Sequence, residues 1–502
     1  MRVEARHGSG SRYLVAVCLL VTAAAIFLNA SLRDGHDWDG DFALYIMQAQ
    51  NIAEGHEYTD TNFIPDPRNA IDPALYPPGL PWLLAPLYRI YGLDVNHLKE
   101  VGIVGLLGFL LVFAYAARDF VEDRLAFAVT ALFAIHPYLV CLKDTIYSEF
   151  PFMLFTYAAL LLTDRLVQSR ADAARVPLAV PALGALLAMC FLTRTVAVVL
   201  FPSVLLAGAY GYRRLVNPVS LAVLVGIVIV GAARIWFPSD SGTYVGYFDQ
   251  LSLASLLSAL TSYAWALSVL LQDQVLHLEV LEWLAVAGFA LLAAVGFAGR
   301  VRRSLSVYEI FAAAYVALLL IFPVHLEPER YSVPIWPLLV LYGLLGAADV
   351  GRWLWGAGGQ CYSPLAMAIM LAVPCIDIDA KMTYGPIAYS VTAPASAELF
   401  TYIKEQLPTD AVVLTRKPTI VGLFAGRKSS IWPDRFDEQD FWQYAHKVHA
   451  RYVVQDIGNV ESPAYFKSDP QLDAFIEQHA AAFQLVFHNG WFNMYRIELP
   501  AQ

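Results

Sequence analysis

The first long polar stretch of the chain, residues 33–97, holds two acids that could act as a general base. Asp39 and Asp41 are separated by one glycine and precede apolar residues at helical spacing up to Ala53, after which Gly55 supplies a stop signal. The pattern predicts a short amphipathic helix on a membrane surface, with one acid at its first turn. Such a carboxylate could cap the helix by accepting backbone N–H bonds. It could also remove a proton from a hydroxyl group at the level of the lipid headgroups.

Two arginines stand next to apolar runs, where a charge is costly. Arg194 interrupts a stretch nearly long enough for two helices, and Arg330 lies between Glu329 and Tyr331. A charge at the centre of a membrane helix costs roughly 2.5 to 3.5 kcal/mol, so both arginines are expected at helix boundaries, pointing into a cavity. Two guanidinium groups at one membrane level could bind a phosphate or diphosphate by forked hydrogen bonds. The alternative is a salt bridge to Glu327, Glu329 or an acid of the first loop.

A third charged group lies between two apolar runs. Lys143 and Asp144 follow one run, and Glu149 opens the next. Glu149 falls in the predicted first turn of a helix, where a negative charge is favourable by up to about 1 kcal/mol, so a structural role would explain it. If these residues face the same side of the membrane as Asp41, they add two acids and a lysine to the candidate site that contains Asp39 and Asp41.

The elements that must position these residues are membrane helices, because the composition is that of a polytopic membrane protein. Hydrophobic residues make up 58% of the chain and charged residues only 15%, which a single water-soluble fold does not tolerate. A hydrocarbon core about 30 Å thick needs roughly 20 apolar residues per helix, and about eleven such segments precede residue 378. They run over residues 13–32, 98–117, 125–142, 150–167, 177–193, 195–212, 216–237, 279–299, 307–325, 331–350 and 362–377.

The placement of Lys and Arg predicts the orientation. Basic residues precede the first segment and recur in every second short connection, and such connections stay in the cytoplasm. The N-terminus is therefore expected in the cytoplasm of a bacterial inner membrane, with the first helix as an anchor rather than a cleaved signal peptide. The 33–97 loop, the 238–278 loop and everything after about residue 378 are expected outside. In the first loop, Tyr76 begins a Tyr-Pro-Pro-Gly run that predicts an extended entry into a second interfacial helix.

The composition changes after residue 378, which divides the chain into a transmembrane domain, 1–378, and an extracytoplasmic domain, 379–502. The second domain is predicted to be a small α/β fold that serves as a lid or an acceptor-docking module. Helical patterns cover residues 395–406, 436–448 and 472–482, and strand patterns cover 411–414, 452–455, 484–487 and 491–499. The five cysteines lie in or beside apolar runs, so no disulfide framework or sulfur-based metal site is expected. No basic stripe interleaved with aromatic residues indicates a nucleic-acid partner.

Five short motifs, in this order and spacing among the helices, resemble the C class of glycosyltransferases (GT-C). The resemblance is to the bacterial group that is like the dolichyl-phosphate-mannose-protein mannosyltransferases and includes the aminoarabinose transferases (glycosyltransferase families 39 and 83), and it covers about residues 37–340. The motifs are Gly40-Asp41-Phe42-Ala43-Leu44-Tyr45 with Ala49-Gln50-Asn51-Ile52-Ala53-Glu54-Gly55, Tyr76-Pro77-Pro78-Gly79, Tyr147-Ser148-Glu149, Thr193-Arg194, and Glu329-Arg330-Tyr331.

The resemblance implies a GT-C fold and a transferase that passes a sugar from a polyprenyl-phosphate donor to an acceptor lipid, glycan or protein outside the cytoplasmic membrane. It also implies an essential acid in the first external loop, here Asp41 or, as second choice, Asp39. The family pattern often has adjacent acids, whereas a glycine separates them here. With that function in view, the candidate residues divide into three groups. The acids Asp41, Asp39 and Glu149 are assigned to catalysis, Arg194, Arg330 and Lys143 to the donor phosphate, and Tyr45, Tyr76, Tyr331 and Asp144 to substrate binding.

We expect no metal cofactor, because the sequence has no dense carboxylate cluster. The leading alternative function is a transporter or flippase of a lipid-linked or anionic envelope substrate, since any many-helix protein with intramembrane arginines could be one. Transporters usually show internal repeats and polar sites near the bilayer midplane, neither of which the sequence displays. A third possibility is a non-catalytic partner in envelope assembly that keeps the fold without its chemistry.

Overall fold

The computed structural model describes residues 10–38, 41–66, 72–170, 176–238, 249, 251–271, 279–322, 327–433, 436–458 and 467–500. The chain forms two compact units. The helical unit comprises Met1–Leu32, Glu100–Trp236 and Ser241–Tyr384, and the sheet unit comprises Arg33–Lys99, Phe237–Asp240 and Gly385–Gln502. This division differs from the predicted boundary at residue 378, because the first long loop belongs with the C-terminal segment rather than with the membrane helices.

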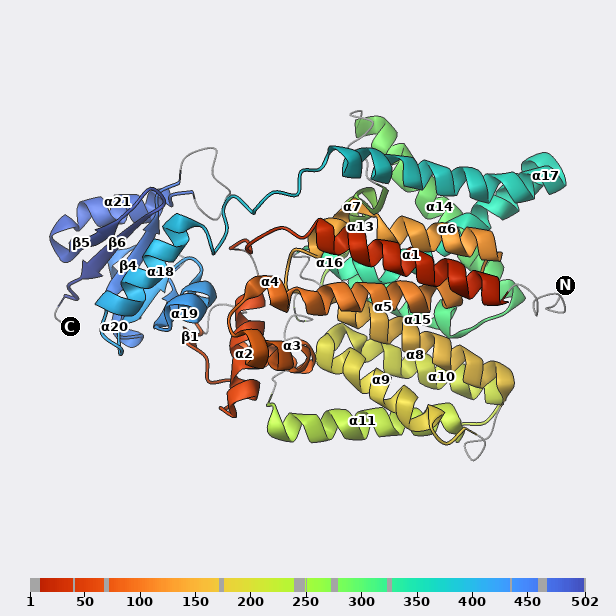
Figure 1. The fold of residues 1–502 in the computed structure, drawn as a ribbon, viewed down its shortest axis with the longest axis horizontal. Helices are drawn as coiled ribbons and strands as arrows, with labels where there is room; N and C mark the ends of the chain where they lie inside the picture. Colours follow the sequence, from red (N-terminus) through yellow and green to blue (C-terminus); the bar gives the residue numbers. More distant parts are fainter. Residues whose placement is uncertain are drawn as a thin grey trace. The chain divides into compact units, whose positions relative to one another are not determined.

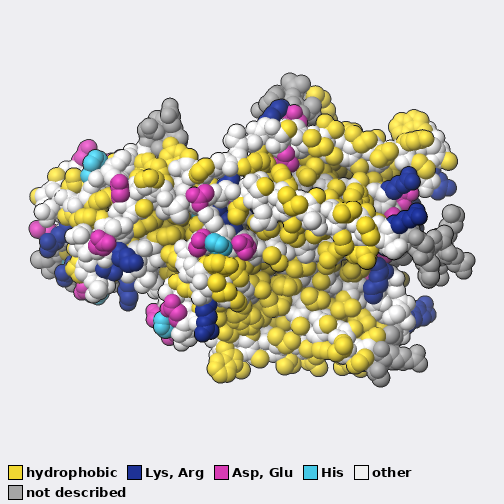
Figure 2. Space-filling view, in the orientation of Figure 1, with side chains coloured by type: hydrophobic (Ala, Val, Ile, Leu, Met, Phe, Trp, Pro, Cys, Tyr) yellow, Lys and Arg dark blue, Asp and Glu magenta, His cyan; other side chains and the backbone are white. Residues whose placement is uncertain are grey.

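The helical unit is a bundle of apolar helices that run side by side (Figure 1). Its elements are α1 (Gly10–Ala30), α5 (Glu100–Ala117), α6 (Asp123–Ala134), α7 (Pro137–Leu142), α8 (Glu149–Ser169), α9 (Ala179–Thr193), η3 (Thr195–Val199), α10 (Leu200–Tyr212), α11 (Pro218–Trp236), α13 (Leu253–Leu271), α14 (Glu279–Arg303), α15 (Val307–Ile321), α16 (Pro328–Ser332), η6 (Val333–Ile335) and α17 (Trp336–Lys381). Within the described residues, eight segments are long and apolar enough to cross a membrane. Apolar side chains cover the visible face of this unit (Figure 2), so the chain is a multi-pass membrane protein.

Most of the predicted membrane segments coincide with these helices, with one informative difference. The predicted outer loop 238–278 contains α13, an apolar helix of 19 residues that packs against α14, α15 and α16. The predicted helices 331–350 and 362–377 lie largely within α17 and are separated at Gly356, whose φ of 67° a residue with a side chain rarely adopts. The predicted total of about eleven segments remains a prediction.

Helix α8 is the central helix of the bundle. Of its apolar window, 61% is buried in the protein, the largest share among the eight candidate spans. It packs closely on α5, and this packing requires a glycine at position 105. A Cβ atom at Gly105 would lie only 2.8 Å from the backbone nitrogen of Pro151. The first turn of α8 therefore has a fixed place in the bundle.

Near the C-terminal end of α8, charged residues link several connections that the sequence predicts to lie on one side of the membrane. Arg165 binds Asp119 with an Nη2–Oδ2 distance of 3.0 Å, and Arg300 donates from Nη1 to the backbone oxygen of Asp119 at 3.1 Å. Lys and Arg side chains gather at the end of the unit where α1 begins (Figure 2). The connections after α5, α8 and α14 thus meet at one end, as the alternation of basic loops predicts.

The sheet unit is a six-stranded sheet with helices on both faces. Its elements are α2 (Phe42–Glu54), β1 (Phe63–Ile64), η1 (Pro73–Leu75), α3 (Gly79–Tyr91), α4 (Val95–Leu98), α18 (Pro394–Gln406), β2 (Val412–Thr415), α19 (Pro418–Ala425), β3 (Lys428–Ile431), α20 (Glu438–Lys447), β4 (Tyr452–Asp456), α21 (Pro470–Gln478), η8 (Ala480–Ala482), β5 (Phe483–His488) and β6 (Phe492–Ile497). The strand order is β1-β3-β2-β4-β6-β5, parallel from β1 to β4 and antiparallel beyond. The predicted helices and strands of the C-terminal segment are confirmed, while β3 and α19 were not predicted.

The first loop joins this unit through a strand and a helix. Strand β1 pairs in parallel with β3, with Phe63 opposite Ser429 and Ile64 opposite Ser430. Helix α2 has the predicted bounds and ends at Gly55 with a φ of 78°. However, most of α2 is buried, because it packs against both α3 and α19. A helix lying on a membrane surface would expose one face, so α2 is better described as part of the folded unit.

We predict that Gly296→Val in α14 destabilises the protein by about 1–3 kcal/mol, because a Cβ atom there would overlap the backbone oxygen of Tyr342 in α17. The measurement is thermal unfolding of the detergent-purified protein. Gly288→Val is the matched control in the same helix, since a Cβ at Gly288 meets no atom within 4 Å. Equal unfolding temperatures for the two variants would contradict the close packing of α14 on α17.

A second prediction concerns pH and Asp456, the last residue of β4. Burial raises the pKa of its carboxyl group to about 7, against the opposing positive charges of Arg416 and Lys417. Between pH of about 4 and 7 the folded state therefore binds more protons than the unfolded state, so this group's contribution to stability falls as pH rises through that window. Asp456→Asn should match the wild type near pH 4 and be more stable than it at pH 8, as measured by denaturant unfolding. The same stability difference at both pH values would contradict the shifted pKa.

Candidate functional site

Three of the predicted site residues meet in the helical unit around a single carboxylate. Glu149 Oε1 lies 2.5 Å from Nη1 of Arg194 and 2.8 Å from Nε of Arg330. Nη1 of Arg194 also donates to Oγ of Ser148 at 3.3 Å, and Arg330 forms a second ion pair with Glu327. The side chain of Glu149 is 1% exposed and each of the two arginines is 9% exposed. We call Glu149, Arg194 and Arg330 the arginine cluster.

Helix ends position each member of the arginine cluster. Glu149 is the first residue of α8, and Arg194 is the residue at which α9 ends in an extended conformation, with a φ of −147°. Arg330 lies in the short helix α16, which starts after Glu327 in a left-handed conformation, with a φ of 49°. Both arginines lie at helix boundaries, as the sequence predicts.

Aromatic rings hold the two guanidinium planes. The Cζ atom of Arg330 lies 3.7 Å from the ring centroid of Tyr147, and that of Arg194 lies 5.0 Å from the ring of Tyr331. Stacking on an aromatic face stabilises a guanidinium group and fixes its orientation. Tyr331 is itself held because its backbone oxygen accepts a hydrogen bond from the hydroxyl of Tyr315 at 2.9 Å. Tyr331 was predicted to bind substrate, whereas Tyr147 was noted only as part of a motif.

The ion pairs of the arginine cluster balance its charges. Glu149 and Glu327 together oppose the two guanidinium groups, so the cluster offers an anion hydrogen-bond donors rather than a net positive charge. Within the described residues, Arg194 donates side-chain hydrogen bonds only through Nη1, which leaves its fork for a phosphate oxygen. The predicted salt bridge to Glu327 is thus confirmed for Arg330. The sequence did not predict that Glu149 would form a salt bridge with both arginines.

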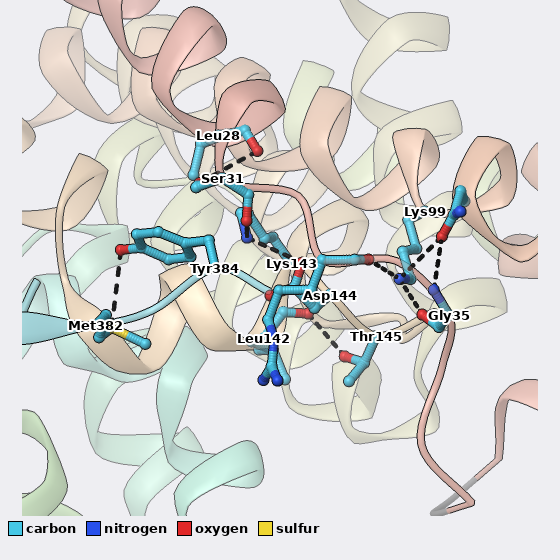
Figure 3. A network of polar contacts seen from close by, with 12 residues as sticks. Leu28, Ser31, Gly35, Lys99, Leu142, Lys143, Asp144, Thr145, Met382 and Tyr384 are labelled. Atoms are coloured by element: carbon cyan, nitrogen blue, oxygen red, sulfur yellow. Dashed lines mark hydrogen bonds and ion pairs between the residues drawn. The ribbon is translucent and has the colours of Figure 1, made fainter. Parts of the chain in front are cut away.

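Lys143 and Asp144 form a separate pair in the helical unit (Figure 3). The Nζ atom of Lys143 lies 2.9 Å from Oδ1 of Asp144 and donates to the backbone oxygen of Ser31 at 2.8 Å. The ring of Tyr384 lies 5.6 Å from the same nitrogen. Because Lys143 is completely buried, these contacts tie the end of α1 to the segment after α7. The role of Lys143 in phosphate binding and that of Asp144 in substrate binding stay predictions.

In the sheet unit, Asp41 occupies the N-cap position of α2 but does not form the capping hydrogen bond. It precedes α2, but its carboxylate accepts no capping bond from the helix backbone. Instead, the hydroxyl of Tyr76 donates to Oδ1 of Asp41 at 2.6 Å, and the rings of Tyr45 and Tyr76 meet edge to face at 5.2 Å. Three predicted site residues therefore lie together, and the capping interpretation of Asp41 lacks its expected contact. Asp39 lies outside the described residues.

Two residues that the sequence analysis passed over hold the segment before α2 in place. Trp38 is buried against the rings of Phe400 and Phe492 at 5.3 and 5.4 Å, and its indole nitrogen donates to Ser396 at 3.3 Å. Lys99 is fully buried, and its Nζ donates to the backbone oxygens of the 33–35 segment (Figure 3). No sequence pattern marks Lys99 as a buried lysine that binds backbone carbonyl groups. By contrast, a tryptophan between two acids, as at Trp38, could have been predicted to be buried and to hold the loop in place.

Among the described residues, no group of three or more His, Cys, Asp and Glu side chains is arranged to hold a metal ion. No protein-family model and no curated protein sequence matches the chain. Solved structures do match. ArnT from Cupriavidus metallidurans, bound to undecaprenyl phosphate, has a TM-score of 0.59 and 16% identity over 97% of this chain and 98% of its own.

Two further solved structures match with lower TM-scores. The oligosaccharyltransferase AglB from Archaeoglobus fulgidus has a TM-score of 0.53 and 14% identity over 88% of this chain and 69% of its own. The arabinofuranosyltransferase AftD from Mycobacteria has a TM-score of 0.53 and 12% identity over 96% of this chain and 41% of its own. All three are GT-C glycosyltransferases. The chain therefore has the GT-C fold, as the motif resemblance implied.

We predict that Glu149→Gln destabilises the protein by about 3–5 kcal/mol, because it leaves two buried guanidinium groups without their carboxylate. The measurement is thermal unfolding in detergent. Asp377→Asn is the control, since its ion pair with Lys381 is exposed and contributes only about 0–1 kcal/mol. A Glu149→Gln protein as stable as the control would show that the arginine cluster does not depend on this charge.

Proposed function

We propose that this protein is a membrane glycosyltransferase that passes a sugar from a polyprenyl-phosphate donor to an acceptor lipid, glycan or protein. The observation that carries the proposal is the arginine cluster at the first turn of the central helix α8. Arg194 uses only Nη1 to bind Glu149 and Ser148, so its other guanidinium nitrogens can donate to a phosphate group. The GT-C fold supports the enzymatic part of the proposal.

The structurally similar proteins support a lipid-linked donor. ArnT was solved with undecaprenyl phosphate bound, and AglB was solved with dolichol-phosphate and an inhibitory peptide. Both ligands combine a long isoprenoid chain with a single phosphate. We assign the same ligand chemistry to this chain, with the phosphate at Arg194 and Arg330 and Lys143 as a third candidate.

The proposed reaction is a single displacement at the anomeric carbon of the donor sugar. The acceptor hydroxyl oxygen forms a bond to that carbon, and the bond between the carbon and the phosphate oxygen breaks. The electron pair leaves with the phosphate, whose added charge Arg194 and Arg330 stabilise. The proton of the acceptor hydroxyl passes to a carboxylate, for which we propose Asp41 with Asp39 as the alternative. Tyr76 would orient that carboxylate through its 2.6 Å hydrogen bond.

We propose that the reaction needs no divalent cation, since the two guanidinium groups can supply the positive charge at the leaving phosphate. Glu149 then has a positioning role, in which its carboxylate sets the spacing of the two arginines. We place the protein in the bacterial inner membrane with its N-terminus in the cytoplasm and its reaction on the outer side. The basic connections that meet at one end of the helical unit support this orientation.

We predict that Asp41→Asn lowers product formation by about 100-fold or more, because it removes the proposed base. The product is first identified by mass spectrometry of envelope glycans from cells with and without the gene, and variants are then tested for restoring it. Tyr76→Phe should lower restoration about tenfold, since the carboxylate keeps its charge but loses its orienting bond.

The matched control is Asp60→Asn, which alters an exposed acid of the same loop and should restore the product fully. Each variant is checked for wild-type amounts in the membrane. If Asp41→Asn and Asp39→Asn both restore the product like the wild type, the proposed chemistry is wrong. A transporter would also tolerate both changes while still moving its substrate.

A further inference from the structure

The helical unit contains a cavity that the proposed transfer chemistry does not use, beside the C-terminal end of α8. Its volume is about 350 Å³, within the range of roughly 300–1,000 Å³ that is typical of small-molecule sites. Its lining residues come from α5, α8, α10, α14, α15 and the connections that follow α5 and α14. Because a helix rises about 1.5 Å per residue, Asp164 in the cavity wall lies roughly 22 Å along α8 from Glu149. The cavity is therefore separate from the arginine cluster.

A buried acid of α8 has an unused oxygen atom in the cavity wall. The side chain of Asp164 is 7% exposed, and its Oδ2 atom accepts a hydrogen bond from Nε2 of Gln168. Arg165 lies 3.9 Å from the same oxygen, but it binds Asp119 more closely, at 3.0 Å. Within the described part of the chain, Oδ1 of Asp164 accepts no hydrogen bond. A ligand with an N–H donor would satisfy this oxygen.

An arginine of α14 supplies an unused donor in the same wall. Arg300 donates from Nε to Oε1 of Glu309 at 3.2 Å and from Nη1 to the backbone oxygen of Asp119 at 3.1 Å. Its Cζ atom lies 4.5 Å from the ring centroid of Phe120, so the guanidinium plane is fixed on two sides. Its Nη2 atom donates no hydrogen bond to any described residue. Arg300 can therefore bind an acceptor oxygen of a ligand without giving up a partner.

The ion pairs around the cavity contain one more acid than arginine. The arginines are Arg118, Arg165 and Arg300, and the acids are Asp119, Asp123, Asp164 and Glu309. A ligand that carries only negative charge would add to this excess, whereas an ammonium group beside Asp164 offsets it. The ligand that fits carries both a cation for Asp164 and an acceptor oxygen for Arg300.

The rest of the wall is apolar and continues onto an exposed apolar surface. Val167, Leu305 and Tyr210 line the cavity. Tyr210 is 65% exposed, and Leu206, one turn earlier on α10, is 57% exposed. In a multi-pass membrane protein, apolar side chains exposed on a membrane-spanning helix contact lipid chains. Acyl chains attached to a ligand in the cavity would therefore have an apolar path along α10.

We propose that this cavity binds the headgroup of an aminophospholipid, the class to which phosphatidylethanolamine belongs, with its ammonium group on Asp164 and a phosphate oxygen on Arg300. Phosphatidylcholine has no N–H donor for Asp164, and phosphatidylglycerol has no cation, so neither meets both requirements. The bound lipid joins α8, α10 and α14 at the end of α8 opposite the arginine cluster. The inference does not depend on the proposed transfer chemistry.

Native mass spectrometry of the full-length protein in detergent tests this inference with the dioleoyl forms of phosphatidylethanolamine, phosphatidylcholine and phosphatidylglycerol. Phosphatidylethanolamine should bind at least about tenfold more tightly than either of the others, since they lack the charge-assisted hydrogen bond to Asp164. Asp164→Asn should remove this preference. Arg300→Lys keeps a cation beside Glu309 but lacks the Nη2 donor, so it should weaken all three lipids and leave the preference intact.

The matched controls change an ion pair at the same end of the unit that does not line the cavity. Arg303 binds Asp349 with an Nη2–Oδ1 distance of 2.7 Å, and Asp349→Asn and Arg303→Lys should bind lipid like the wild type. O-phosphoethanolamine has the charges of the headgroup without its apolar chains. At equal concentration it should not displace the lipid.

Three results would overturn the inference: equal binding of the three lipids, an unchanged preference in Asp164→Asn, and displacement of the lipid by O-phosphoethanolamine at equal concentration. Thermal unfolding checks that each variant is folded. The comparison among lipids needs only the wild-type protein, so it tests the inference whether or not a variant folds. Because no sugar transfer is measured, Asp41→Asn should bind the lipids like the wild type, which separates this inference from the transferase proposal.

Discussion

The candidate site of the helical unit depends on one interaction, the shared bond of Glu149 to Arg194 and Arg330. Three buried charges are tolerated there because the carboxylate lies between two guanidinium groups, each stacked on a tyrosine ring. Removing the carboxylate would leave like charges together, and removing one arginine would free the other to turn. The interaction therefore sets both the position and the charge of the proposed phosphate site.

The close contact of α8 with α5 is what keeps this interaction in place. Glu149 lies in the first turn of α8, and Gly105 in α5 admits the backbone of Pro151 two residues later. The helix start thus has little freedom to move relative to its neighbour. The proposed transfer reaction needs such rigidity, because charge stabilisation of a leaving phosphate is effective only when the charged groups are already oriented.

The sheet unit combines segments that lie far apart in the sequence. Strand β1 of the first loop extends the sheet built by the C-terminal segment, and Asn62 donates to the backbone oxygen of Gly422 at 3.0 Å. Trp38 inserts into the same unit from the start of the loop. The proposed base Asp41 therefore belongs to a folded unit that the first loop and the C-terminal segment build together.

Hydropathy and periodicity were sufficient to predict the membrane helices, because burial in lipid demands long apolar runs, and to predict α2 and α18, because Gly55 and Pro394 mark a helix end and a helix start. They failed at α13, although its mean hydropathy is no lower than that of α8, and at β3, whose Lys-Ser-Ser-Ile sequence lacks the apolar residues of a buried strand. The joining of the first loop to the C-terminal segment depends on long-range pairing, which no local pattern encodes. Likewise, the spacing of Glu149, Arg194 and Arg330 in the chain gave no sign that one carboxylate oxygen serves both arginines.

Lipid binding measured by native mass spectrometry tests the central claim most directly, because it reports on the arginine cluster without requiring the sugar or the acceptor. We expect the protein to retain undecaprenyl phosphate and not undecaprenol, and we expect Arg194→Gln and Arg330→Gln each to lose the phosphate-dependent retention while remaining folded. Equal retention of the phosphate and the alcohol, or unchanged retention in both variants, would contradict it.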